Sequence, residues 1–368
     1  MIRPATPADL AELVRIENAS FQTDRFSRRN FRYLLTQANA CTLAETDNGS
    51  LRGYAMLLFN TGTSLARLYS YAVDPAFRGR GIGEALVAAA EQEALAHDCI
   101  ALRLEVRRDN RASIRLFEKN GYRAIGTVED YYEDHMDAVR YEKSLAPHLE
   151  PDMVRVPYYE QTLDFTCGPS ALLMAMKTLQ PQIGMDRREE LRIWRESTTI
   201  YMTSGHGGCG PYGLALSAWH RGFDVEIYVN DKGALFIDSV RSEKKEVMRL
   251  VQEDFVEELK GLPVKLNYRP IKVAELQEKF EQGGIPIVLI SSYRIYREKF
   301  PHWVVVTGFD DKYIYVHDPF VDTDMQKTQT DVINMPILKR DFERMARYGK
   351  AGQKAVLIIK NRQNEKDE

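Results

Sequence analysis

The chain of 368 residues has few cysteines and no hydrophobic run long enough to cross a bilayer. The four cysteines are Cys41, Cys99, Cys167 and Cys209. They are widely spaced and include no C-x-x-C pair, which argues against a disulfide framework and against a zinc knuckle. We therefore expect free thiols and no metal site.

A signal peptide and a strong charge imbalance are also lacking. The N-terminal segment MIRPATPADLAELVRIENAS carries acidic residues and has no apolar core. The 50 Lys and Arg residues nearly balance the 53 Asp and Glu residues, which leaves a net charge of −3. We therefore expect a cytoplasmic protein that binds neither nucleic acid nor membranes. The sequence leaves the oligomeric state open.

Lysine is scarce in the first 145 residues, which contain only two, and is plentiful afterwards. Close to this change, the segment APHLEPDMVRVP contains three prolines, which favour an extended connector. The length of the chain suits two domains, each with its own core. We predict a first domain over residues 1–146, a linker over 147–157, a second domain over 158–361 and a polar tail over 362–368.

A glycine-rich loop is the main motif of the first domain. The segment LARLYSYAVDPAFRGRGIGEALVAAAEQEALAH predicts a strand ending at Val73, a turn at Asp74-Pro75, this loop, and an alanine-rich helix. Its glycines would let the backbone approach a ligand, and the helix would direct free N–H groups and its positive dipole end toward a pyrophosphate. A tight turn explains such glycines equally well. The loop lacks the P-loop and dinucleotide patterns.

The segment LRLEVRRDNRASIRLFEKNGY follows this helix. With the loop and the first segment RPATPADLAELVRIENASF, it resembles the GNAT acetyltransferases over residues 1–145, and most of all the ribosomal-protein N-terminal alanine acetyltransferases. The resemblance implies an α/β domain with a mixed central sheet, flanking helices, and acetyl-CoA as cofactor. The implied acetyl-CoA site comprises Tyr71, Ala72 and Val73 for the acetyl and pantetheine end, Arg78, Gly79, Arg80, Gly81, Ile82, Gly83 and Glu84 around the pyrophosphate, and Asn110 for the far arm.

Glu105 is the candidate general base for acetyl transfer. Residues 102, 104 and 106 of the strand ALRLEVR form an apolar face, which places Glu105 on the opposite face. An acceptor amine must lose a proton before it can attack. A solvated glutamate neutralised by Arg103 or Arg107 would give the same pattern, and the resemblance favours the catalytic role.

The resembled enzymes use a tyrosine as proton donor, but this chain has Phe117 at that position, which has no proton to give. Tyr122, Tyr131, Tyr132 or a water are the alternatives. Tyr131 and Tyr132 lie in the acidic segment VEDYYEDH, which could line a pocket for a basic substrate. We expect a peptide or protein N-terminus as acceptor, with a small amine as the alternative.

Cys167 is the candidate nucleophile of the second domain. In EQTLDFTCGPSALLMAM it directly precedes a run of apolar residues at helical spacing, and a cysteine at a helix start beside a histidine ionises readily. Gln161, six residues earlier, could donate a hydrogen bond to an oxyanion. Cys209 is followed by the same Gly-Pro pair but has Thr203 six residues before it, so we interpret Cys209 as structural. A core residue at a helix start is the alternative for Cys167.

The segment PHWVVVTGFDDKYIYVHDPF predicts the histidine partner. Two β-rich runs flank a turn signal and predict a hairpin. In a hairpin centred near Asp310, His302 and Asp318 are opposite each other, with Cβ atoms about 4.5–5.5 Å apart. Register alone would then orient the imidazole of His302. In the alternative, His302 caps a strand and Asp318 makes an Asp-Pro turn.

Gln161, Cys167, His302 and Asp318 occur in that order within a glutamine six residues before C-G-P, then H-W-V-V-V-T-G-F-D and Y-V-H-D-P. This pattern resembles the papain-like cysteine peptidases that remove double-glycine leaders from bacteriocin precursors, over residues 155–360. The resemblance implies an α+β papain-like domain with a Cys-His-Asp triad. We expect a bifunctional peptide-modifying protein, an N-acetyltransferase joined to a cysteine peptidase or amidase. In the alternative, the second domain only binds peptide for the first.

Overall fold

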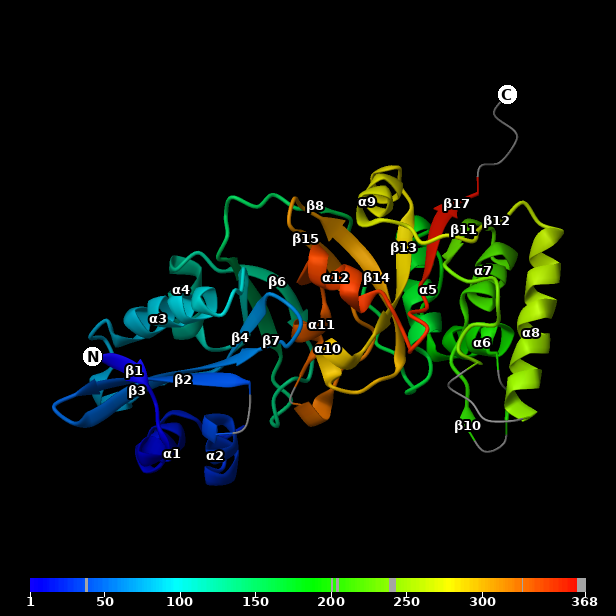
Figure 1. Cartoon of the computed structure of the whole chain (residues 1–368). Coiled ribbons are helices and arrows are strands. Elements are labelled where there is room, and N and C mark those ends of the chain that lie inside the picture. The colour runs from blue at the N-terminus through cyan, green and yellow to red at the C-terminus, as the bar shows by residue number, and fades with distance from the viewer. Residues whose placement is uncertain (37–38, 200, 203–204, 238–242, 326, 363–368) are drawn as a thin grey trace. The chain divides into compact units, whose positions relative to one another are not determined.

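The computed structural model of the chain describes residues 1–36, 39–199, 201–202, 205–237, 243–325 and 327–362. The chain divides into two compact units, residues 1–149 and 150–368, each with its own sheet (Figure 1). The predicted polar tail lies outside the described residues, except for its first residue. In the described part of the chain, no helix has both the length and the apolar character that crossing a bilayer requires.

The first unit is a mixed sheet with helices on both faces, as predicted. Its strands are β1 (Ile2–Pro4), β2 (Ala40–Asp47), β3 (Ser50–Phe59), β4 (Leu65–Val73), β5 (Ala101–Arg107), β6 (Arg123–Val128) and β7 (Ala138–Ser144). Its α-helices are α1 (Leu10–Ser20), α2 (Arg28–Thr36), α3 (Ile82–Ala96) and α4 (Arg111–Lys119). The sheet order is β1-β2-β3-β4-β5-β7-β6, and β4 runs parallel to β5 between otherwise antiparallel neighbours.

Successive side chains of a strand point to opposite faces of the sheet, so each face of this sheet has its own core. Met56 of β3 packs with Leu13 of α1 on one face. Its neighbour Leu57 packs with Leu86 of α3 on the other face. The helices α1 and α2 therefore cover one side of the sheet, and α3 covers the opposite side.

The strands β4 and β5 separate along their length. Their pairing covers Leu65–Arg67 with Ala101–Arg103, although both strands continue beyond these residues. On its other edge, β4 pairs with β3 through a β-bulge at Tyr69. A bulge increases the local twist of a strand and turns it away from its neighbour. An opening between β4 and β5 follows, next to the glycine loop.

The second unit is built on a sheet of order β12-β11-β17-β13-β14-β15-β16, with β8 paired to β14. The strands of the second unit include β8 (Asp152–Met153), β9 (Tyr201–Met202), β10 (Gly205–His206), β11 (Phe223–Val229), β12 (Lys265–Asn267), β13 (Ile285–Ser291), β14 (Pro301–Phe309), β15 (Tyr313–His317), β16 (Met335–Leu338) and β17 (Ala355–Asn361). Its helices include α5 (Cys167–Leu179), α6 (Arg187–Ser197), α7 (Pro211–His220), α8 (Glu243–Lys260), α9 (Val273–Glu281), α10 (Tyr293–Tyr296), α11 (Gln329–Val332) and α12 (Lys339–Met345).

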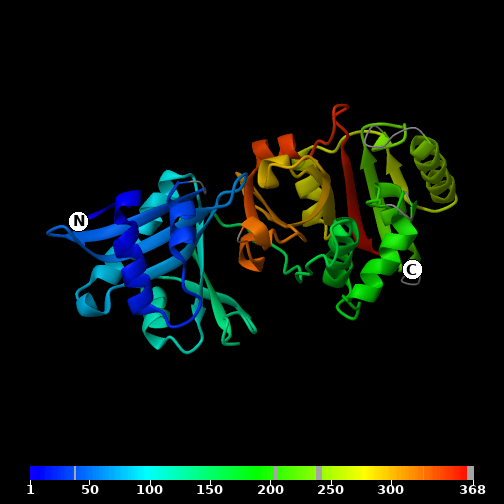
Figure 2. The same ribbon diagram turned by 90° about the horizontal axis from the view of Figure 1, so that it is seen from below.

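Helices cover both faces of this second sheet. Figure 2 shows α5, α6 and α7 on one side, and α9 and α12 on the other. Leu289 of β13 packs with the first group, and its neighbour Ile290 packs with the second. A strand that is buried on both faces is apolar, as β13 is from Ile285 to Ile290.

The predicted hairpin forms from β14 and β15, but the predicted register is wrong. Asp310 N donates to Tyr313 O at 3.1 Å, so the loop is Asp311-Lys312 and is not centred on Asp310. Val305 is opposite His317, and a bulge follows between residues 306 and 308. Relative to the predicted register, the later turn and the bulge together shift β15 by two residues along β14.

His302 therefore does not face Asp318 across the hairpin. It pairs instead with Ile290 of β13, and Asp318 directly follows the end of β15. A shift of two residues keeps side chains on the same face of a sheet, because the side-chain period of a strand is two. The two side chains remain diagonal neighbours, within reach of each other.

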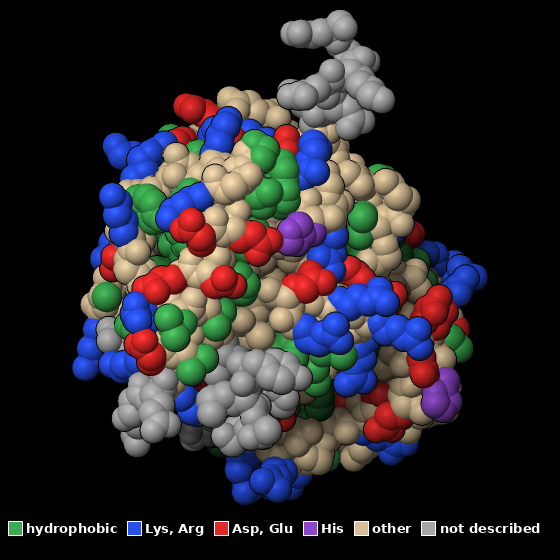
Figure 3. Space-filling model, turned by 90° about the vertical axis from the view of Figure 1, so that its right-hand side faces the viewer, with side chains coloured by type: hydrophobic (Ala, Val, Ile, Leu, Met, Phe, Trp, Pro, Cys, Tyr) green, Lys and Arg blue, Asp and Glu red, His purple; other side chains and the backbone are tan. Residues whose placement is uncertain are grey.

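The face seen in Figure 3 carries acidic and basic side chains side by side. On α8, ion pairs join Arg249 to Glu246 and Glu253, and Lys260 to Glu257. This mixture agrees with the small net charge of −3. Among the described side chains that Figure 3 shows, no broad area carries charge of one sign alone.

Candidate active sites

A cleft of about 430 Å³ lies at the end of β4, between the glycine loop and the start of α4. Its lining includes Tyr71, Ala72, Val73, Arg78, Gly79, Gly81, Ile82, Gly83, Glu84 and Asn110. These are the residues that the resemblance assigns to acetyl-CoA, apart from Arg80. The guanidinium of Arg80 lies 5.3 Å from the centre of the Phe77 ring.

The backbone of the glycine loop fits a pyrophosphate. Gly79 (φ +76°) and Gly81 (φ +77°) adopt the left-handed conformation that favours glycine, and a Cβ on either would meet no atom within 4 Å. Gly81 is the N-cap of α3, so the free N–H groups of the first turn border the cleft. Gly83 has another reason to be glycine, because a Cβ there would collide with the hydroxyl of Tyr71.

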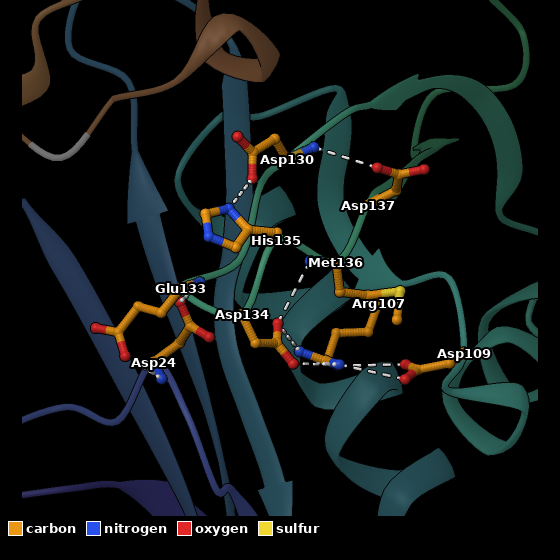
Figure 4. Close-up of polar contacts among 9 residues, drawn as sticks. All are labelled: Asp24, Arg107, Asp109, Asp130, Glu133, Asp134, His135, Met136 and Asp137. Atoms are coloured by element: carbon orange, nitrogen blue, oxygen red, sulfur yellow. Dashed lines mark hydrogen bonds and ion pairs between the residues drawn. The ribbon is translucent and has the colours of Figure 1, made fainter.

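A second cleft of about 900 Å³ adjoins the first, and Tyr71, Asn110 and Ser113 line both. The loop between α1 and α2 and the loop between β6 and β7 contribute to its lining. Glu133 N donates to Asp24 Oδ1 at 3.1 Å, and Asp24 N donates to Glu133 Oε2 at 3.3 Å, so these loops are tied together (Figure 4). This second cleft is the candidate acceptor site.

Glu105 lines the acceptor cleft as half of a buried ion pair. Its Oε2 lies 2.9 Å from Arg67 of β4, and the two side chains are 4% and 1% exposed. Arg67 Nη2 also donates to the hydroxyl of Tyr131 at 2.8 Å. The alternative of a solvated glutamate is therefore wrong. Sequence reasoning missed Arg67. It could have been found as the single charged residue in the strand LARLYSYAV.

The candidate proton donors divide between the cleft and the core. Phe117 lines the acceptor cleft and packs edge-on against Tyr71 and Tyr122, with ring centres 5.9 and 5.3 Å apart. Tyr122 is buried in the core and is absent from the described lining of both clefts. Tyr131 and Tyr132 both line the acceptor cleft. The geometry favours these two tyrosines over Tyr122.

Glu17 is a second buried carboxyl at the acceptor cleft that sequence reasoning missed. It accepts from the hydroxyl of Tyr54, and its Oε1 accepts from Phe26 N at 2.9 Å. Tyr54 also shares a hydrogen bond of 2.8 Å with Ser70, another lining residue. Burial raises the pKa of Glu17. Its signal in the sequence is a glutamate at helical spacing from Leu13, on the buried face of α1.

In the second unit, Cys167 is the first residue of α5 and is 8% exposed. The next residue packs tightly, since a Cβ on Gly168 would lie 3.2 Å from Trp303 Cδ1 and 3.4 Å from Cys209 Cβ. Such contacts leave room for glycine alone without a shift of these neighbours. The start of α5 is therefore pressed against β14.

His302 and Asp318 are in direct contact. His302 Nε2 lies 2.6 Å from Asp318 Oδ1, and the side chains are 2% and 0% exposed. Burial disfavours the protonated imidazole, but the charges of Asp318 and Cys167 and hydrogen bonds to both raise the pKa of His302 to about 10. The structure therefore brings Cys167, His302 and Asp318 together, by a route other than the predicted register.

Asp318 is held by further donors. Phe320 N donates to its Oδ1 at 2.9 Å, and the hydroxyl of Tyr296 donates to its Oδ2 at 2.7 Å. The rings of Tyr296, Phe300 and Phe320 also lie around the imidazole of His302, with centres 5.8–6.5 Å from it. These rings keep water from the His302–Asp318 contact. Tyr296 is a residue that sequence reasoning missed.

Gln161 lies beside the Asp318 turn, because its backbone N donates to Pro319 O at 2.8 Å. Its side-chain Nε2 donates to Leu163 O at 2.9 Å. A primary amide nitrogen has two protons, so one proton of Nε2 is left for an oxyanion. Its Oε1 is buried and has no hydrogen-bond partner in the described part of the chain.

Cys209 has the contacts of a packed core residue. It is 6% exposed, and its carbonyl accepts from Trp303 Nε1 at 3.0 Å. Burial and the nearby charge of Cys167 raise the pKa of its thiol well above the ordinary value. A thiol in such surroundings stays protonated and unreactive.

Comparison with known proteins gives a family for each half of the chain. The model of the Peptidase_C39 like family matches residues 156–360, and that of the acetyltransferase (GNAT) family matches residues 9–122. An uncharacterized protein of Mycobacterium leprae is 32% identical over 135 residues, which are 36% of this chain and 37% of that protein. The ribosomal protein bS18-alanine N-acetyltransferase of Salmonella typhimurium is 36% identical over 77 residues, which are 20% of this chain and 52% of that enzyme.

These matches span about a third to a half of the curated relatives. Among solved structures, the ribosomal-protein-S18-alanine N-acetyltransferase from Escherichia coli is 26% identical with a TM-score of 0.36, covering 39% of this chain and 93% of that one. The predicted order of a GNAT domain followed by a peptidase-like domain is confirmed. The chain belongs to the Peptidase_C39 like family and carries an N-terminal GNAT acetyltransferase domain.

Proposed function

We propose that this protein modifies peptides in two ways, as an acetyl-CoA-dependent N-acetyltransferase and as a cysteine peptidase or amidase. The observation that carries the second activity is the buried contact of 2.6 Å between His302 and Asp318, with Cys167 as a neighbour that raises the pKa of His302. Two adjoining clefts, one for a cofactor and one for an acceptor, support the first activity.

For acetyl transfer, the loop 79–84 and the first turn of α3 would hold the pyrophosphate of acetyl-CoA, which supplies the acetyl group. Glu105 would take a proton from the ammonium of the acceptor, and Arg67 would compensate the charge of Glu105 between turnovers. A peptide or protein N-terminus is the proposed acceptor, since a relative is named as a ribosomal protein bS18-alanine N-acetyltransferase. A small amine is the alternative acceptor.

For amide cleavage, the thiolate of Cys167 would attack the carbonyl carbon and form a C–S bond. His302 would give its proton to the departing amine as the C–N bond breaks. Water would then cleave the thioester, its proton returning to His302 and the free acid leaving. Gln161 would donate to the oxyanion at each addition step, and Asp318 would keep Nδ1 of His302 directed at the reacting atoms.

Thiol reactivity tests the second activity. Iodoacetamide near neutral pH, followed by peptide mapping, should alkylate Cys167 well before Cys209. His302→Ala should slow the alkylation of Cys167, because it removes the cation that stabilises the thiolate. If Cys167 in the folded protein reacts no faster than Cys209, the peptidase proposal fails and a peptide-binding module takes its place.

A further inference from the structure

We propose that Glu190 is a positioning residue of the cysteine site, an inference that rests on the proposed peptidase function. Glu190 lies on α6, 23 residues after Cys167, and is fully buried. Its carboxylate binds the loop that carries Gln161 and also the first turn of the helix that carries Cys167. One side chain therefore sets the position of the proposed oxyanion donor relative to the proposed nucleophile.

The carboxylate accepts hydrogen bonds from four residues. Oε1 accepts from Thr162 N at 2.8 Å, from the hydroxyl of Thr166, and from the hydroxyl of Ser170 at 3.3 Å. Oε2 accepts from the hydroxyls of Thr162 at 2.7 Å and Tyr159 at 3.0 Å. Thr166 is the N-cap of α5, and Ser170 lies in its first turn. The contacts thus reach from the loop into the helix.

The loop over 157–166 needs such support, because it contains no regular helix or strand. Gln161 stands between Tyr159 and Thr162, and both are held by Glu190. On its other side, the backbone of Gln161 is tied to Pro319, next to Asp318. Glu190 and the Asp318 turn therefore hold the oxyanion donor from two directions.

The surroundings of Glu190 point to a role beyond stability. In the described part of the chain, its partners are hydroxyls and one backbone N–H, and no ion pair joins it to a cation. A buried carboxylate without a cation is costly, and apolar packing at such a position is often as stable. The first turn of α5 offsets part of this cost through its positive dipole end. The rest of this cost is accounted for by function, because the carboxylate positions the residues of the site.

Two reagents separate positioning from thiol reactivity. Iodoacetamide alkylates a thiolate by displacement and forms no oxyanion. With p-nitrophenyl acetate, the thiolate of Cys167 adds to the ester carbonyl, the oxyanion collapses, the C–O bond breaks, and p-nitrophenolate leaves acetyl-Cys167. Only the second reaction depends on an oxyanion donor held at the right place.

Glu190→Gln should therefore slow the acylation of Cys167 by p-nitrophenyl acetate by about 10-fold to 10²-fold. Its alkylation by iodoacetamide should stay within about threefold of the wild type, because the Cys167–His302 contact is untouched. Thr162→Val, at an exposed loop position, removes one hydroxyl bond to Glu190 and should act in the same direction, more weakly. Glu189→Gln is the matched control, since Glu189 lies on the same helix but binds Arg192 and Arg221.

Equal acylation rates in the wild type and in both variants would overturn the positioning role while leaving the reactive thiol in place. A parallel loss of both reactions in both variants would also overturn it, because Glu190 would then support the thiol or the fold in general. If wild-type Cys167 reacts selectively with neither reagent, the proposed peptidase function fails, and this inference fails with it.

Discussion

Replacing Asp318 by Asn should make the stability of the second unit less dependent on pH. The substitution removes the charge but keeps the oxygen that contacts His302 Nε2 at 2.6 Å. The pKa of His302 is about 10 in the folded chain and 6.5 ordinarily. At 1.36 kcal/mol per pKa unit, this difference corresponds to about 5 kcal/mol at most. Because the folded pKa is raised, the stabilisation is complete below pH 6.5 and is lost as pH rises toward 10.

Urea unfolding followed by tryptophan fluorescence measures this effect selectively, because all three tryptophans, at 194, 219 and 303, lie in the second unit. We expect Asp318→Asn to lower the free energy of unfolding by about 2–4 kcal/mol near pH 6.5, less than the full value of about 5 kcal/mol because Cys167 also raises the pKa of His302, and by much less near pH 10. Asp311→Asn, an exposed change on the same hairpin, should cost less than about 0.5 kcal/mol at either pH. If the variant loses the same free energy of unfolding at both pH values, a charged His302–Asp318 pair does not stabilise the second unit.

Glu105→Gln should lower acetyl transfer by about 10²–10⁴-fold while calorimetry shows nearly unchanged acetyl-CoA affinity; full activity in the variant would exclude Glu105 as the base. Phe117→Tyr should change kcat by less than about threefold, because Tyr131 already lines the acceptor cleft, and a larger gain would show that a proton donor is missing. Gly83→Ala should change the stability of the first unit by less than about 1 kcal/mol in thermal unfolding, because the Tyr71 hydroxyl that its Cβ would meet is the end of a flexible side chain that lines a cleft and can turn aside; a larger loss would show that this ring is fixed in place. Tyr296→Phe should slow the alkylation of Cys167 while leaving that of Cys209 unchanged, since Asp318 loses a donor at 2.7 Å; equal rates for Cys167 in both proteins would contradict this.

Local patterns in the sequence were sufficient for the parts of the site that lie within one element. The glycine loop, the start of α5 at Cys167 and the run of β14 all follow from propensity and periodicity over short segments. The register between β14 and β15 did not follow, because the exact position of the turn and the presence of a bulge are not visible in a hydrophobic pattern. His302 and Asp318 meet regardless, since a displacement of two keeps both on one face.

The residues that the sequence did not reveal are buried polar groups whose partners are distant in the chain. Arg67 of β4 pairs with Glu105 of the neighbouring strand β5, and Glu190 binds a loop about 30 residues before it. A charged residue in an apolar pattern shows that a partner must exist, because an unpaired buried charge is costly. The pattern does not show which partner it is, since only the folded chain brings the two groups together.

Intact-mass analysis of a peptide library incubated with the full-length protein, with and without acetyl-CoA, tests the two proposed activities together. We predict that some peptides gain one acetyl group only when acetyl-CoA is present, and that others are shortened by cleavage with or without it. The shortening should disappear in Cys167→Ala, and the acetylation should fall in Glu105→Gln. Peptides that remain unchanged under every condition, or that are shortened equally by Cys167→Ala, would contradict the proposal.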